Sequence, residues 1–155
     1  ASKQDLTYMD PNTNERYLPY VIEPAVGVDR LLLAIITSAL EVEELEGGDS
    51  REVLRLNPKI APVKVAILPL VKKLSENALE IFSDLSEDFK VEFDETGTIG
   101  KRYRRQDVIG TPWCVTFDYD SLEDDSVTVR HRDSMEQERI RIKDLKKYFL
   151  NEIKG

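Results

Sequence analysis

The chain is poor in cysteine and histidine, the residues that form disulfides and most zinc sites. Its 155 residues include one cysteine and one histidine, which excludes an internal disulfide and leaves no Cys/His cluster with zinc-site spacing. A lone cysteine fits a reducing compartment, so we expect a cytoplasmic protein. The glycine-rich motifs of phosphate-binding P-loops and of dinucleotide-binding folds are also missing.

Long apolar segments are missing as well. The longest apolar run, residues 31–36, lies between Arg30 and Glu41 and falls far short of the roughly 18 residues that a membrane-spanning helix needs. The start of the sequence has no basic stretch followed by an apolar one, so no secretory signal is visible. We therefore expect no membrane partner.

An excess of positive charge is absent too. The net charge is -8, which argues against generic nucleic-acid binding, because that binding depends on clustered cations. The charge is unevenly placed, however. Acidic residues gather at 41–49 and 118–125, and basic residues gather at 101–105 and in the C-terminal third. Local basic patches on an acidic body suit selective contact with one RNA, although they are equally typical of ordinary solvated faces.

The spacing of three aspartates in the second acidic run bears on metal binding. Asp118, Asp120 and Asp124 loosely resemble a calcium-binding loop, but the glycine and the closing glutamate of such a loop are absent. We interpret them as an acidic hairpin turn and predict no metal site. We also expect His131 to be a strand residue and Cys114 to belong to the core.

The first third of the chain predicts a hairpin, a helix and a linker. Residues 7–9 and 16–22 read as strands joined by a turn rich in Pro and Asn. Residues 28–40 are apolar nearly all round, as in a buried helix. The acidic stretch 41–50 contains Gly47 and Gly48 and predicts a loop or linker, with a short helical turn at 51–56.

The remaining residues alternate between strand and helix patterns. Pro58 and Pro62 indicate a domain boundary near residue 58. We then expect five strands, with helices after the first, the second and the last; the strands are residues 63–68, 90–93, 113–119, 126–132 and 138–142. The helices are expected at residues 70–85 and 99–108 and from residue 143 onward. This order predicts an α/β fold, a three-layer domain whose five-stranded mixed sheet carries helices on both sides.

One short motif closely resembles a known enzyme family. Residues 20–30 read Tyr-Val-Ile-Glu-Pro-Ala-Val-Gly-Val-Asp-Arg, a strand, a turn and a helix start. The run is similar to motif 3 of the class II aminoacyl-tRNA synthetases, and its Glu-Pro pair resembles the glycyl-tRNA synthetases. The resemblance implies that Arg30 is catalytic and contacts ATP, and that Glu23 and Gly27 belong to the substrate and ATP site. Synthetases for glycine usually carry Ser where this chain has Ala25, so one hydrogen bond to the substrate is lost.

Elementary chemistry is compatible with these roles. A guanidinium is permanently charged and forks onto phosphate oxygens, a carboxylate can hold the ammonium group of an amino acid, and glycine lets the backbone approach a ligand. The motif alone equally allows a structural role, in which Arg30 forms a salt bridge with Asp29 or Glu23.

A longer resemblance covers the second half of the chain. Residues 61–70, 98–112, 115–124 and 127–137 look like the anticodon-binding domain of glycyl-tRNA synthetases. Unpaired anticodon bases are read by stacking and by hydrogen bonds to base edges, while cations position the phosphates. We expect the RNA contacts to come from one patch of residues: Lys101, Arg102, Arg105, Arg130, Arg132 and Asp133. Arg132 and Asp133 should point to opposite sides of a strand end. Each arginine could instead be salt-bridged to one of the many carboxylates.

These resemblances predict the C-terminal part of a glycyl-tRNA synthetase. Residues 1–41 would end the catalytic domain, residues 42–58 would be an acidic linker, and residues 59–155 would bind the anticodon of glycine tRNA. The full enzyme would be a homodimer that uses ATP and Mg²⁺ to join glycine to tRNA through glycyl-adenylate. The chain alone lacks the earlier motifs, so we expect it to be inactive and to need no cofactor.

Two other classes of protein remain open at this point. The same domain type occurs in other class IIa synthetases and, as a non-catalytic module, in the accessory subunit of the mitochondrial DNA polymerase. The net charge of -8 also allows a small domain whose partner is another protein.

Overall fold

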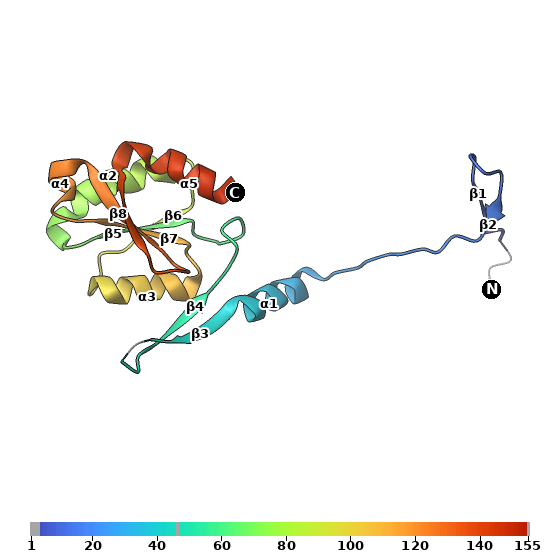
Figure 1. The fold of residues 1–155 in the computed structure, drawn as a ribbon, viewed down its shortest axis with the longest axis horizontal. Helices are drawn as coiled ribbons and strands as arrows, with labels where there is room; N and C mark the ends of the chain where they lie inside the picture. The colour runs from blue at the N-terminus through green and yellow to red at the C-terminus, as the bar shows by residue number, and fades with distance from the viewer. Residues whose placement is uncertain (1–3, 46, 155) are drawn as a thin grey trace. The chain divides into compact units, whose positions relative to one another are not determined.

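The computed structural model describes residues 4–45 and 47–154, so Glu46 of the first acidic run lies outside the description. The chain divides into two units, residues 1–31 and 32–155, each described here by itself. Figure 1 shows the course of the chain and the labels of its helices and strands. None of the helices within the described residues is long and apolar enough to cross a membrane.

The first unit contains a short antiparallel pair of strands. β1 (Tyr8–Met9) pairs with β2 (Arg16–Tyr17), and the rings of Tyr8 and Tyr17 pack edge to face. The predicted second strand, residues 16–22, is too long, because β2 ends at Tyr17 and residues 18–27 have no regular structure. Isolated pairs of strands are marginal in water, and among the described residues this pair has no third strand that could bond with residues 18–22.

Helix α1 (Val28–Ala39) forms where the apolar pattern predicts it. Ala39 packs in a small cluster with Leu56 and Ala61, joined by the half-buried Ile35 and Leu54. Leu31, Leu32 and Leu33 stay at least half exposed.

The predicted acidic linker is instead a hairpin. β3 (Leu40–Glu44) pairs antiparallel with β4 (Ser50–Leu54), and Gly47 and Gly48 take positive φ values in the turn between them. The glutamates of β3 have basic partners that follow in the sequence. Glu43 lies directly opposite Arg51 and binds it, and Arg55 binds Glu41. Opposite charges facing each other across an antiparallel pair stabilise it, so the stretch is neither a loop nor, at residues 51–56, a helical turn.

The second unit is built on the predicted five-stranded mixed sheet, which the structure confirms. Its order is β6-β5-β7-β8-β9. β5 pairs parallel with both β6 and β7, whereas β7–β8 and β8–β9 are antiparallel. The five strands are β5 (Val65–Pro69), β6 (Val91–Phe93), β7 (Trp113–Phe117), β8 (Ser126–His131) and β9 (Gln137–Arg141). β5 and β7 are buried along their whole length, as central strands covered on both faces should be.

Helices cover the two faces of this sheet unequally. On one face lie α2 (Ser75–Ser86), after the turn η1 (Lys72–Leu74), and α5 (Leu145–Lys154), after η2 (Ile142–Asp144). They pack on the main core, which includes Ile67, Val115 and Phe149. On the other face α3 (Ile99–Ile109) places Ile99 and Tyr103 over Ala66, Leu68 and Cys114. Figure 1 shows α3 on the side of the sheet opposite α2 and α5.

The predicted acidic hairpin turn between β7 and β8 contains one helical turn, α4 (Ser121–Asp124). It ends at Asp125, whose φ of 51° lies in the left-handed region. Aspartate tolerates this region better than most residues, so the connection closes without a glycine.

Candidate nucleic-acid interface

The residues of the motif 3-like segment are all exposed. Glu23 and Gly27 lie in the irregular stretch before α1, and Arg30 lies in the first turn of that helix. Within residues 4–45 and 47–154, Arg30 forms no ion pair, so the suggested salt bridge to Asp29 or Glu23 is not made. Its guanidinium is therefore available to an anion.

Three of the expected RNA-binding residues lie on the first turns of α3. Arg102 is buried, and its guanidinium donates to the carbonyl oxygens of Pro69 and Gly97. Arg105 is exposed and donates from Nε to Asp94 Oδ2 at 2.9 Å and from Nη2 to Thr96 O at 2.6 Å. Arg102 therefore braces the loop that follows β6, whereas Arg105 is oriented by that loop and faces solvent.

Lys101 completes this group on α3. It is exposed and makes no ion pair with any other described residue. Its ammonium is a free positive charge, about one helical turn before Arg105.

Arg130 belongs to a second group, which is buried. Its Nη1 and Nη2 donate to the two carboxylate oxygens of Asp107 at 2.9 and 3.1 Å. The same guanidinium lies over the ring of Tyr103, 4.8 Å from its centre, and the Tyr103 hydroxyl bonds with Thr116. The buried Arg130 side chain thus holds α3 against β8.

Arg132 and Asp133 bind each other. Arg132 donates from Nε to Asp133 Oδ1 at 2.7 Å, and its other nitrogens donate to the carbonyl oxygens of Gly110 and Leu56. The expectation that these two side chains point to opposite sides was wrong, because β8 ends at His131 and strand alternation no longer applies. Burial alone would raise the pKa of Asp133, but Arg132 and Arg55 outweigh it and lower that pKa.

The structure does not bring the six residues together into one surface. Arg102 bonds at Pro69, where β5 ends, and Pro69 pairs with Phe117 at the end of β7. Arg130 instead pairs with Cys114 near the start of β7, and Arg132 contacts Gly110 beyond the last turn of α3. Lys101, Arg102 and Arg105 therefore lie at one end of α3, and Arg130, Arg132 and Asp133 lie at the other.

Two buried residues that bond with these arginines, Asp107 and Arg51, were missed by the sequence reasoning. Asp107 is fully buried and also accepts from Arg51 Nη1 at 3.2 Å. No sequence pattern separates this aspartate from the chain's many exposed carboxylates; its position after the arginines of α3 is the one signal that could have been used.

A third residue that the sequence reasoning missed, Arg139, binds the acidic turn between β7 and β8. Its guanidinium donates to Asp118 Oδ2 at 2.6 Å and to Asp124 Oδ1 at 3.1 Å. Burial raises the pKa of Asp118, but the bonds from Arg139 and Ser121 outweigh it and lower the pKa. These carboxylates hold an arginine and brace the turn onto β9.

Free cations gather at the sheet edge where the parallel strands end. Each of them is exposed and forms no ion pair with any described residue. These cations are Lys72, Lys73, Lys101, Arg141 and Lys143. The first two follow β5, Lys101 follows β6, and Arg141 pairs with Ser126, which comes after the end of β7.

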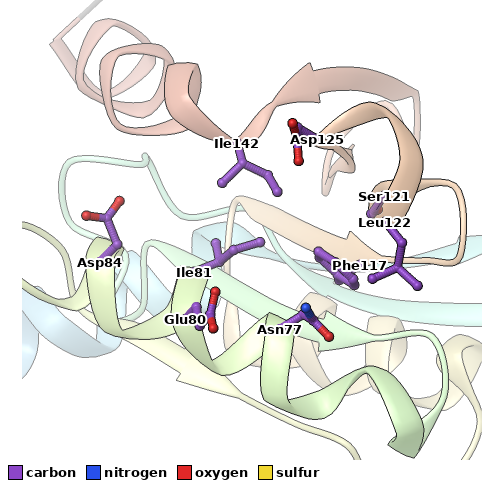
Figure 2. A pocket seen from close by; sticks show the side chains of 9 residues that line it. All are labelled: Asn77, Glu80, Ile81, Asp84, Phe117, Ser121, Leu122, Asp125 and Ile142. Atoms are coloured by element: carbon purple, nitrogen blue, oxygen red, sulfur yellow. The ribbon is translucent and has the colours of Figure 1, made fainter.

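The α2 side of that edge has a different character. A cavity of about 360 Å³ lies between α2 and the α4–η2 segment. Ile81, Phe117 and Ile142 provide its apolar lining (Figure 2). Its rim includes Glu80, Asp84 and Asp125. Carboxylates repel phosphates, so this cavity is a poor site for a phosphate group.

The fold is of a class found in aminoacyl-tRNA synthetases. The prolyl-tRNA synthetase of Cryptosporidium parvum, solved with L-proline and AMP, matches with a TM-score of 0.60 and 27% identity, over 65% of this chain and 22% of that one. Residues 64–152 match the model of the anticodon binding domain, and the chain belongs to that family.

Similarity to glycine–tRNA ligases extends along nearly the whole chain. The chain is 59% identical to the enzyme of Clostridium acetobutylicum over 153 residues, which are 99% of this chain and 33% of that protein. It is 61% identical to the enzyme of Clostridium beijerinckii over 147 residues, 95% of this chain and 32% of that protein. The chain thus spans about a third of the length of the curated relatives it matches.

Proposed function

We propose that this chain is the C-terminal part of a glycine–tRNA ligase and that residues 59–155 bind the anticodon of glycine tRNA. The observation that carries the proposal is the similarity to glycine–tRNA ligases over 99% of the chain, together with the anticodon binding domain at residues 64–152. The same similarity disfavours the accessory subunit of a polymerase. The parent enzyme is a cytoplasmic homodimer that joins glycine to its tRNA through glycyl-adenylate.

Residues 1–41 carry the part of the catalytic domain that meets ATP, and residues 42–58 join it to the anticodon-binding domain. Arg30 is suited to the ATP phosphates, because its guanidinium is exposed and has no ion pair within the described residues. Glu23 and Gly27 belong to the same site. ATP would supply the adenylyl group that glycine takes up, with pyrophosphate as the leaving group, and Mg²⁺ would offset the phosphate charge. The chain alone forms no adenylate, which an ATP–pyrophosphate exchange assay checks.

Arg105 is the residue best placed to read a base. Asp94 and Thr96 engage its Nε and Nη2, so the guanidinium plane is fixed, while Nη1 has no partner among the residues described. A fixed donor facing solvent can discriminate base edges with little loss of side-chain entropy. Glycine anticodons carry C at the second and third positions, and the Watson–Crick edge of cytosine offers acceptors to such a donor.

The other five residues of the expected patch have different roles. Lys101 is a free cation for a phosphate. Arg102, through Gly97 O, shapes the loop that orients Arg105. Arg130, Arg132 and Asp133 keep the opposite end of α3 in place, and only Asp133, which is half exposed, retains access to RNA.

Binding to two transcripts tests this function. The chain is titrated at moderate salt with glycine tRNA and with a transcript in which both anticodon C positions are changed. We expect the altered transcript to bind about tenfold or more weakly, because each mismatched base in a recognised site costs about 1–3 kcal/mol. Equal affinity for both transcripts would overturn anticodon reading by this chain.

A further inference from the structure

We propose that Asp107 is a positioning residue: it locks the β3–β4 hairpin onto α3 and so fixes the RNA-reading helix relative to the C-terminal half of α1. This inference rests on the proposed function, and concerns how a tRNA held at its anticodon is kept in register with the site of amino-acid transfer.

The first step is the junction of α1 with the hairpin. α1 ends at Ala39 and β3 begins at Leu40, so no loop separates them. Arg55 N donates to Ala39 O at 2.7 Å, and Ile35 and Ala39 pack with Leu56 and Ala61. The C-terminal half of α1 is therefore fixed to the hairpin, and Arg30 lies in the first turn of the same helix.

The second step is the buried ionic contact between the hairpin and α3. Arg51, on β4, donates from Nη1 to Asp107 Oδ2 at 3.2 Å and to Arg132 O at 3.0 Å. Its side chain is 1% exposed and that of Asp107 is 0% exposed, so water does not screen the pair. Because Arg130 holds the same carboxylate, one anion ties together β4, α3 and β8.

The third step is the close packing around that contact. A Cβ added to Gly110 would meet Leu54 O at 2.9 Å, which means that the end of α3 lies directly against β4. Arg104 donates to Ser50 O at 3.0 Å and binds Asp49 at 2.6 Å at the outer end of the hairpin. The hairpin thus contacts α3 along several turns, and α3 is the helix that presents Lys101 and Arg105.

These three contacts form one continuous path from α1 to the RNA-reading residues. Without the Asp107 carboxylate the buried Arg130 guanidinium would lose its anion and Arg51 would keep only Glu43, so the contact between the hairpin and α3 would be weakened. The anticodon-binding domain would still bind RNA, because Lys101 and Arg105 lie at the other end of α3. Its orientation to α1 would no longer be fixed, and the acceptor end of a bound tRNA would be misplaced.

The test uses the full-length enzyme that contains this chain. Asp107→Asn removes the charge and keeps the shape, and Arg51→Met cuts only the hairpin side and leaves the Arg130–Asp107 pair. Leu85→Ala is the control, because it weakens the core beneath α2 without touching the hairpin. Urea unfolding confirms that each variant is folded at the assay temperature.

Three readouts separate positioning from folding: ATP–pyrophosphate exchange without tRNA, tRNA binding, and kcat for aminoacylation. For both hairpin variants we expect exchange and tRNA binding to stay within about threefold of wild type and kcat to fall by about a hundredfold, as for a misplaced reacting group. For Leu85→Ala all three should stay close to wild type. An unchanged kcat in the hairpin variants, or an equal loss in Leu85→Ala, would overturn the proposal.

The wild-type enzyme in the same assay separates this inference from the function on which it rests. Failure of the wild type to distinguish the two glycine transcripts overturns anticodon reading. Clear discrimination by the wild type, combined with full aminoacylation by Asp107→Asn, overturns the positioning role alone.

Discussion

Arg51 and Asp107 are separated by 56 positions in the sequence and meet in the interior, with Nη1 of the arginine 3.2 Å from Oδ2 of the aspartate. The same carboxylate binds Arg130 through both of its oxygens. A single buried anion therefore holds a strand of the hairpin, a helix and a strand of the main sheet. Several arginines that sequence patterns assign to RNA are needed for this interior network.

Replacement of Asp107 by asparagine should destabilise the fold strongly. An amide cannot offset the buried Arg130 guanidinium charge and would leave Arg51 with Glu43 alone, and breaking a buried ion pair on one side costs about 3–5 kcal/mol. We expect that fall in the free energy of unfolding, measured by urea titration followed by circular dichroism. Asp88→Asn is the matched control, because Asp88 pairs with Lys146 at the surface, and its loss should be far smaller. Equal losses would contradict the assignment of Asp107 as the central anion.

Gly110→Ala should destabilise more than Gly97→Ala. Both glycines have a φ near +80° (84° and 80°), so both substitutions strain the backbone by about 1–2 kcal/mol. A Cβ at Gly110 would also meet Leu54 O at 2.9 Å, whereas one at Gly97 meets no atom of a described residue within 4 Å. The difference between the two unfolding free energies measures how tightly α3 packs on the hairpin. No difference would mean that this contact is loose.

Lys101→Gln and Arg105→Gln should affect RNA binding in different ways. Loss of a phosphate contact at Lys101 weakens all transcripts alike and reduces the slope of log K against log salt by about 0.7–1. Loss of a base contact at Arg105 lowers the discrimination between the glycine tRNA and the transcript with altered anticodon. Filter binding at several salt concentrations reads both effects. Lys154→Gln, at the far end of α5, serves as the control of equal charge.

Cys114 should make the stability fall at alkaline pH. Burial raises the pKa of its thiol to about 12, well above the ordinary value of 9.0. The folded state keeps its proton where the unfolded state loses it, so the stabilisation is complete below about pH 9 and is lost as the pH rises toward 12. Between about pH 8 and about pH 10 the wild type should lose about 1–2 kcal/mol more than Cys114→Ala in urea unfolding. Parallel losses would contradict a buried, protonated thiol.

The sheet could be predicted from the sequence because its strands carry a strong local signal. Residues 65–69 and 113–117 are short, mostly apolar runs flanked by turn residues. A strand that is buried on both faces shows this pattern. The hairpin could not be predicted in this way. Glu41 and Glu43 read as a solvated linker until their partners, Arg51 and Arg55, are seen opposite them.

The candidate site was harder to predict than the fold. Arginine is mostly exposed in proteins, so Arg102, Arg130 and Arg132 read as surface cations, although each is at most 6% exposed. Their burial depends on distant groups, such as Leu56 O and Asp107, that no local pattern identifies. Lys101 and Arg105, which belong to the same helix as Arg102, lie at the surface.

The most direct test of the central claim is nuclease protection of glycine tRNA by this chain. We predict protection confined to the anticodon loop, with the acceptor arm cleaved as in free tRNA, and loss of that protection in the double variant Lys101→Gln, Arg105→Gln. Protection elsewhere on the tRNA with an open anticodon loop, or full protection by the double variant, would contradict an anticodon reader that works from the first turns of α3.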